Sequence, residues 1–209
     1  MIRLDDVEAH PSSSETMEPP LIVIENLEPI TEWVLLEYEH ASKIAMGNII
    51  FTNADDKRLE RLGKVYRESF TEVVEPDKTI ILDPSANQPL RTEDFDRYRY
   101  FVIGGICGDS PPKNRTKDLV SSRLPEADRR NLGKKQLTTD SAVLMVMLVY
   151  TGERIEDIEV TDSVEIRYSE NESTVLPFGY IVMENRVIMT PGLIELLVRR
   201  RKEYSGRVF

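Results

Sequence analysis

The chain has 209 residues, of which 40% are hydrophobic and 31% are charged, a composition that suits one core-forming domain with an extension rather than a disordered chain. Its single cysteine, Cys107, excludes an intramolecular disulfide framework and a cysteine-based zinc site. The longest apolar run, residues 142–150, is too short for a membrane span, and the acidic N-terminus has no apolar signal core, so we expect a soluble, cytoplasmic protein with no membrane partner.

The formal charge of −10 is concentrated in two segments. Residues 1–40 hold ten acidic groups and one basic group, and residues 153–173 hold eight acidic and two basic groups. An acidic total argues against wrapping of long nucleic acids. Residues 113–135, with eight basic and three acidic groups, leave a ribosomal or RNA contact open, and a solvated mixed-charge surface is the alternative.

The first half of the chain predicts short buried strands that alternate with helices. Residues 1–20 are expected to form an acidic, flexible tail, and a single folded domain is expected over residues 21–209. The elements expected in this half are a strand over residues 21–24, a helix from Thr31 to about Ala45 that ends at Gly47, a strand over 48–52, a helix over 55–62, a strand over 79–82 and one or two helical turns over 92–97.

The second half begins with the clearest buried strand, residues 100–106. It continues with a helix over 116–123, a strand over 129–132, a helix over 140–150 capped by Thr138 or Thr139 and ended by Gly152, extended segments over 164–168, 174–178 and 180–189, and a last helix opened by Pro191. The 140–150 helix is apolar nearly all round and should be buried. Such alternation favours an α/β fold with a mainly parallel sheet, which binds ligands at the carboxyl ends of its strands.

Three glycines lie within five residues at the end of the 100–106 strand: Gly104, Gly105 and Gly108. They allow a backbone to approach a ligand closely. Their spacing is not that of the G-x-G-x-x-G dinucleotide fingerprint, two prolines follow, and the chain contains no G-K-[ST] phosphate loop. A tight turn without a ligand is the alternative interpretation.

A polar loop, residues 131–139, leads into the apolar 140–150 helix. The free N–H groups of the first turn of that helix could bind a carboxylate or hydroxyl group. Ordinary helix capping is the alternative.

Several blocks carry a family resemblance in one order along the chain, at residues 22–28, 32–38, 51–53, 82–86, 101–109, 111–112, 115–116, 132–133, 136–140 and 176–178. Together they resemble the SPOUT methyltransferases. They are more similar still to the small family described as S-adenosylmethionine-dependent RNA methyltransferases, a eukaryotic member of which methylates an arginine of a small-subunit ribosomal protein. Asn26 stands where many relatives have a histidine.

The resemblance implies a SPOUT-like, mainly parallel sheet flanked by helices, with a deep C-terminal trefoil knot. It also implies S-adenosyl-L-methionine as the cofactor, bent within the knot and held mostly by main-chain groups of three loops; no metal is expected. Carried onto this chain, the cofactor-binding residues are Leu82, Asp83, Pro84, Gly104, Gly105, Gly108, Asp109, Leu132, Gln136, Leu137, Thr138 and Thr139. Of these, Leu132 and Leu137 are expected to cover the adenine faces.

An arginine acceptor would require carboxylates, because its guanidinium is a cation with a pKa above about 12. Carboxylates hold such a group through fork-like hydrogen bonds and can accept its proton. We therefore expect Glu25, Glu37 and Asp109 as catalytic residues, with Asp83 as a further carboxylate near the site. The alternative roles are turn formation for the two aspartates and solvated surface positions for the two glutamates.

An RNA acceptor would instead require a basic surface and stacking side chains. The candidates are Arg115, Lys117, Arg123, Arg129 and Arg130, with Tyr98 or Tyr100 nearby. Trp33 is expected in the core, and His40 is expected to be structural. The absence of a dedicated RNA-binding module and the overall acidity favour a ribosomal-protein arginine as substrate. An rRNA or tRNA methyltransferase of the same fold and a non-catalytic ribosome-associated module are the alternatives, and the sequence is compatible with a homodimer or a monomer.

Overall fold

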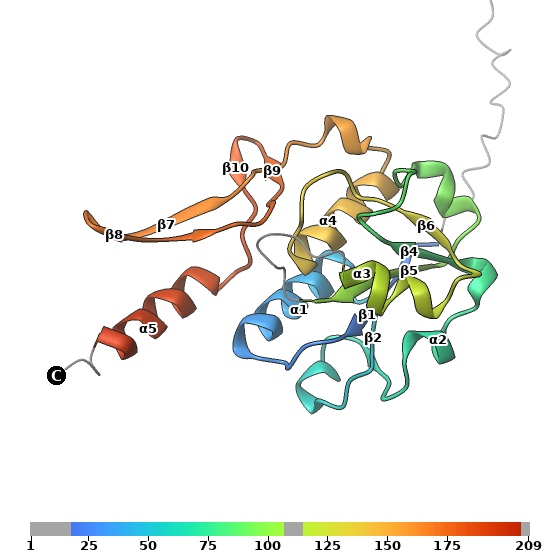
Figure 1. The fold of residues 1–209 in the computed structure, drawn as a ribbon, viewed down its shortest axis with the longest axis horizontal. Helices are drawn as coiled ribbons and strands as arrows, with labels where there is room; N and C mark the ends of the chain where they lie inside the picture. The colour runs from blue at the N-terminus through green and yellow to red at the C-terminus, as the bar shows by residue number, and fades with distance from the viewer. Residues whose placement is uncertain (1–17, 107–114, 206–209) are drawn as a thin grey trace, which may run out of the picture.

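The computed structural model describes residues 18–106 and 115–205, and its centre is a six-stranded parallel sheet (Figure 1). The strand order is β3-β2-β1-β5-β4-β6. The strands are β1 (Leu21–Asn26), β2 (Ile49–Thr52), β3 (Lys64–Val65), β4 (Thr79–Leu82), β5 (Tyr100–Gly105) and β6 (Asp128–Arg130). The predicted mainly parallel α/β architecture is confirmed, and the trefoil knot stays a prediction.

The register of the sheet brings the carboxyl ends of its central strands to one edge. Glu25 pairs with Gly104 and Asn26 pairs with Gly105, so β1 and β5 end side by side. On the other side of β5, β4 and β6 also run parallel to it. The turns that leave β1, β5, β4 and β6 are therefore neighbours, as a parallel sheet requires.

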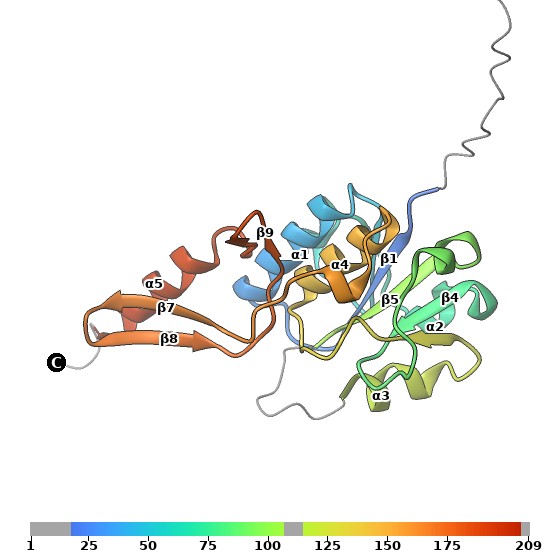
Figure 2. The same ribbon diagram turned by 90° about the horizontal axis from the view of Figure 1, so that it is seen from above.

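Helices cover both faces of the sheet (Figure 2). The helices of the molecule are α1 (Glu32–Ile44), α2 (Phe70–Val73), α3 (Arg115–Leu119), α4 (Thr139–Tyr150) and, away from the sheet, α5 (Leu193–Ser205). On one face α1 and α4 pack over side chains such as Ile22, Ile24 and Phe101, whereas α2 and the segment after α3 cover Val23 and Val102 on the other. Short 3₁₀ turns occupy Lys57–Leu59, Pro76–Lys78, Thr92–Asp96, Ser121–Arg123 and Ile155–Asp157. None of the described helices is long and apolar enough to cross a bilayer.

The predicted caps of α1 and α4 are present. The Thr31 side chain accepts a hydrogen bond from the Val34 N–H, and the Thr138 side chain accepts one from the Ser141 N–H. Gly47 and Gly152 follow these helices with φ of 79° and 104°, a region that favours glycine and ends a helix. As predicted, α4 is buried over most of its surface.

A C-terminal arm, residues 164–205, extends away from the sheet (Figures 1 and 2). It contains the antiparallel ribbon β7 (Val164–Ser169) and β8 (Glu172–Leu176), the small hairpin β9 (Val182–Met183) and β10 (Arg186–Val187), and α5. The members of its own buried cluster are Ile166, Leu176, Tyr180, Leu193 and Leu196. Trp33 and Leu36 of α1 pack against this cluster, so the arm is joined to the sheet domain through α1.

Three predicted helices differ from the structure. Residues 55–62 form only the 3₁₀ turn Lys57–Leu59, because Leu59 is the one buried side chain there and Asp56 bonds the Arg58 N–H instead of continuing a helix. The expected helix over 116–123 is divided into α3 and a 3₁₀ turn, with Val120 outside helical geometry between them. The last helix begins at Leu193 rather than at Pro191, because Gly192 has a φ of 82°.

Candidate functional site

A cavity of about 280 Å³ lies where α1, the end of β5, the loop before α4 and the C-terminal arm meet. It is lined by Thr31, Trp33, Val34, Glu37, Tyr38, Gly105, Ile106, Leu137, Thr138, Thr139, Phe178 and Arg200. Five of the residues predicted from the sequence are therefore brought together here: Glu37, Gly105, Leu137, Thr138 and Thr139. The predicted residues Gly108 and Asp109 lie outside the described parts of the chain.

The turns after β4 and β6 lie beside each other at the same sheet edge. The Asp83 N–H donates to the Arg130 carbonyl, and the Asn131 side chain donates to the Ala86 carbonyl. Leu82 and Leu132 pack on the α1–α4 side of the sheet, whereas Pro84 is exposed. The three loops that were expected to hold a cofactor thus follow adjacent strands, although the loop residues Leu82, Asp83, Pro84, Gly104, Leu132 and Gln136 do not line the 280 Å³ cavity.

Gly105 is a glycine because Tyr38 occupies the space where a side chain would be. A Cβ at this position would overlap the Tyr38 hydroxyl and would lie 3.1 Å from the Glu25 carbonyl oxygen. The Tyr38 hydroxyl donates to the Asn26 side-chain oxygen at 2.9 Å. Asn26 therefore holds a tyrosine of the cavity wall at the end of β1.

Glu37 is the buried carboxyl of the cavity. The Trp33 indole N–H, one helical turn earlier on α1, donates to Glu37 Oε1 at 2.6 Å. Burial raises the pKa of Glu37 to about 7, with a further contribution from the Asp140 charge, while hydrogen bonds from Trp33 and Thr139 act in the opposite direction. This group can therefore gain or lose a proton near neutral pH.

Asp140 lies beneath the cavity with 1% exposure. Its Oδ2 is 2.7 Å from His40 Nδ1 and accepts a 2.7 Å hydrogen bond from the Thr190 hydroxyl. Its Oδ1 accepts hydrogen bonds from the Thr138 hydroxyl and the Ser141 N–H. The carboxylate thus ties α1, the start of α4 and the segment before α5 together, and a structural role for His40 stays a prediction.

The Tyr180 hydroxyl is fully buried and has no hydrogen-bond partner among the residues that the structure describes. Burial raises the pKa of Tyr180, and the charges of Glu37 and Asp140 raise it further. The hydroxyl therefore stays protonated and can serve as a donor close to these two carboxyl groups.

Glu25 lies outside the cavity, although the sequence predicted it as a catalytic residue. Because side chains alternate along a strand, it points to the α2 side of β1. Its buried carboxylate accepts four hydrogen bonds, from the Thr52 and Ser69 hydroxyls, the Phe70 N–H and the Arg123 guanidinium. In this structure all its bonding capacity is used to join β1, β2, α2 and the turn at residue 123.

Asp83 is likewise fully hydrogen-bonded, to Ser85 of its own turn and to Ser121. It is 1% exposed and accepts from the Ser85 N–H, the Ser85 hydroxyl and the Ser121 hydroxyl. This is the turn-forming arrangement that was the alternative to a role in the site.

Sequence reasoning missed the arm's contribution to the cavity, Phe178 and Arg200, and placed Trp33 simply in the core. The spacing of Trp33 and Glu37, one helical turn apart, was a usable signal for their pairing. Nothing local in the sequence places Phe178 or Arg200 beside α1, since that contact depends on how the arm folds back.

Comparison with known proteins gives one consistent family. The family model described as protein arginine N-methyltransferase SFM1-like matches residues 21–204. The chain is 34% identical over 197 residues to protein arginine N-methyltransferase SFM1 of Saccharomyces cerevisiae, over 84% of this chain and 92% of the yeast protein. The crystal structure of yeast SFM1 complexed with SAH (S-adenosylhomocysteine) matches with a TM-score of 0.78 at 31% identity, over 84% of this chain and 93% of that chain.

The yeast enzyme complexed with SAM (S-adenosylmethionine) matches equally well, with a TM-score of 0.78 at 30% identity over 87% of this chain and 91% of that chain. A Trm10 structure from Thermococcus kodakaraensis, with a TM-score of 0.55 at 17% identity, covers 66% of this chain and 96% of its own and shares the fold alone. This chain belongs to the SFM1-like family of protein arginine N-methyltransferases, built on a SPOUT fold.

Proposed function

We propose that this chain uses S-adenosyl-L-methionine to methylate an arginine of a ribosomal protein in the cytoplasm. The family membership supports the reaction, and the solved yeast relative has been complexed with SAM and with SAH. The observation that carries the proposal is Glu37, a carboxyl in a cavity with a pKa of about 7. A cationic acceptor and a proton to be removed both call for such a group.

The cavity wall fits one end of an adenosyl ligand. Gly105 presents its main chain to the cavity, Ile106 and Leu137 offer apolar contacts, and Thr138 and Thr139 offer backbone and hydroxyl groups. The methyl donor supplies an activated carbon on a sulfonium, so the protein mainly has to bind and orient the two reactants.

Glu37 would bind the acceptor guanidinium through its carboxylate and receive the proton that leaves when the N–C bond forms and the S–C bond breaks. Trp33 and Thr139 fix the orientation of this carboxyl by their hydrogen bonds. A pKa of about 7 lets Glu37 be ionised before the transfer and take up a proton during it, which is the property of an effective general base at neutral pH.

The basic residues considered for RNA are largely engaged by carboxylates. Arg115 pairs with Glu28, Arg123 with Glu25, and Arg130 with Asp94. The other two candidates, Lys117 and Arg129, are exposed and form no ion pair with the residues that the structure describes. This arrangement favours a protein acceptor over an RNA acceptor, because phosphate binding needs free cations.

The test is an assay with tritiated S-adenosylmethionine and two acceptor pools, ribosomal proteins and stripped ribosomal and transfer RNA. We expect label that is lost on protease treatment and kept on nuclease treatment. Glu37→Gln should lower the labelling rate about a hundredfold or more. Glu39→Gln, which removes a carboxylate two residues along α1 that pairs with Arg61, should leave the rate unchanged.

Three results would contradict the proposal. Nuclease-sensitive label would identify the RNA methyltransferase, and absence of label together with absence of cofactor binding would identify the non-catalytic module. Equal rates for Glu37→Gln and the parent would remove Glu37 from the reaction.

A further inference from the structure

Arg200 is the only basic residue among the described residues that line the cavity. It comes from α5 of the C-terminal arm and is partly buried. A guanidinium stays charged at every pH at which proteins fold. The cavity therefore carries a fixed positive charge in addition to the titratable carboxyl of Glu37.

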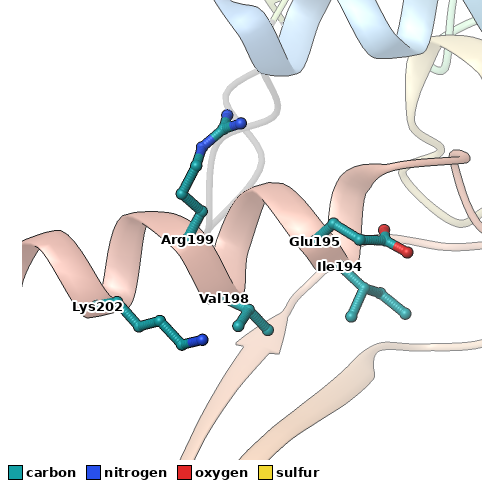
Figure 3. Close-up of a pocket in the computed structure, with 5 residues that line it drawn as sticks. All are labelled: Ile194, Glu195, Val198, Arg199 and Lys202. Carbon is teal, nitrogen blue, oxygen red and sulfur yellow. The ribbon is translucent and has the colours of Figure 1, made fainter.

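The two arginines beside Arg200 in the sequence are already paired. Arg199 pairs with Glu32 of α1, and Figure 3 shows its side chain extending from α5 toward that helix. Arg201 pairs with Glu172 of β8 and lies 5.5 Å from the centre of the Tyr168 ring. Within the described parts of the chain, Arg200 has no ion pair and no hydrogen bond.

The second hollow on α5 does not explain Arg200. It measures about 340 Å³ and is lined by Ile194, Glu195, Val198, Arg199 and Lys202 (Figure 3), and Arg200 is not among its lining residues. Nothing in the structure shows what would cover this hollow. Arg200 alone of the arginine run is directed to the cavity that holds Glu37.

A partly buried cation without a counter-charge is unfavourable unless an anion arrives with the ligand. The acceptor arginine is itself a cation and would be repelled by Arg200. In S-adenosylmethionine the only anionic group is the α-carboxylate of its methionine moiety. A guanidinium matches a carboxylate with two parallel hydrogen bonds.

We propose that Arg200 is the carboxylate clamp of the cofactor and binds the α-carboxylate of its methionine moiety. This inference rests on the proposed placement of the cofactor in the cavity. Each charged side chain of the cavity then binds a different ligand. Arg200 attracts the anionic end of the cofactor, and Glu37 attracts the cationic acceptor. The arm would thereby contribute directly to cofactor binding.

The test compares two ligands that differ only in the group concerned: S-adenosylmethionine and decarboxylated S-adenosylmethionine. Their affinities are measured by calorimetry without acceptor, for the full-length parent, Arg200→Gln, Arg200→Lys and the matched control Arg199→Gln. We expect Arg200→Gln to weaken S-adenosylmethionine binding at least about tenfold and to leave the decarboxylated ligand within about twofold. Arg200→Lys should recover part of the loss, and Arg199→Gln should change neither affinity by more than about twofold.

Several outcomes would overturn the clamp. A loss that is equal for both ligands would mean that Arg200 supports the cavity in general, and the absence of any loss would mean that it binds neither. The same selective loss in Arg199→Gln would point to general positive potential on α5. A methyl group found on Arg200 by peptide mass spectrometry would make it an acceptor instead. Failure of the parent to bind either ligand would contradict the proposed function itself.

Discussion

Two buried carboxyl side chains, Glu37 in the cavity wall and Asp140 behind it, have different hydrogen-bond environments. Asp140 accepts hydrogen bonds from several donors, including Thr190 and the Ser141 N–H. Glu37 is bonded by Trp33 and Thr139, and burial dominates its pKa. A buried carboxyl whose pKa is raised toward neutrality is typical of acid–base sites, which supports the proton-accepting role proposed for Glu37.

Asp140→Asn should lower the pKa of Glu37 below about 7, because the negative charge of Asp140 contributes to raising it. If ionised Glu37 is the base, kcat/KM falls as the pH drops through this pKa, so the acidic limb of the profile should lie near pH 7 in the parent. In Asp140→Asn this limb should move to lower pH. The measurement is the pH dependence of kcat/KM in both proteins at constant ionic strength.

Tyr180→Phe provides the matched comparison, since it removes a buried hydroxyl near the same two carboxyl groups without changing the charge. It should shift the limb less than Asp140→Asn does and not to lower pH. A limb that stays in place or moves upward in Asp140→Asn would contradict the electrostatic coupling between Asp140 and Glu37.

At the scale of the element, the start of α4 is the best-supported helix terminus of the molecule. Thr138 accepts from the Ser141 N–H, as an N-cap residue does, and its hydroxyl also lies 2.7 Å from Asp140 Oδ1. Thr31 caps α1 in the same way through Val34 but makes no bond to a buried carboxylate. The same segment that begins α4 lines the cavity, so stability and site geometry depend on one turn.

Thr138→Val should therefore lower the free energy of unfolding by about 1–2 kcal/mol. The loss should exceed that of Thr31→Val, because Thr138→Val also removes a donor from the buried Asp140 carboxylate. Urea unfolding followed by far-ultraviolet circular dichroism measures both changes. Equal losses in the two variants would show that the bond to Asp140 adds nothing to the cap.

Local signals account for the elements that the sequence predicted correctly. The strand over 79–82 is a short apolar run with a turn residue, Asp83, at its end, and the α1 and α4 caps are threonines placed before apolar helices. The expected helix over 55–62 was wrong because its charged residues mimic a helical surface while only Leu59 is buried. Periodicity reports which face could be buried, and tertiary contacts decide whether it is.

In the molecule as a whole, α1 connects the C-terminal arm to the sheet domain, because both pack against this helix. Trp33 and Leu36 pack against the arm cluster, while Val34 and Tyr38 of the same helix pack toward the sheet. The arm is further held by the Arg199–Glu32 pair, whose members are 167 positions apart in the chain. Contacts of such separation carry no local signature, which is why Phe178 and Arg200 could not be assigned to the site from the sequence.

Leu196→Ala should loosen the arm before the sheet domain unfolds. Leu196 is 2% exposed in the arm cluster, and truncation of a buried leucine costs about 2–5 kcal/mol. Trp33 is the single tryptophan of the chain and contacts this cluster. Its fluorescence should therefore shift to the red at lower urea concentration than the loss of far-ultraviolet circular dichroism.

The control is Val23→Ala, at a fully buried position of β1 whose side chain lies on the α2 face of the sheet. In this variant the two signals should change together, because the substitution lies in the sheet domain and away from the arm. Coincident transitions in Leu196→Ala would show that arm and sheet unfold as one unit.

The cavity is completed by Phe178 and Arg200 of the C-terminal arm, which follows β6 and α4 in chain order, whereas its sheet edge is complete once β6 and α4 exist. During synthesis the polypeptide can thus build its parallel sheet well before α5 has left the ribosome. The part of the cavity wall that α5 supplies is therefore formed last. Until α5 is made, the cavity lacks Arg200, and it is complete only once the arm has folded back onto α1.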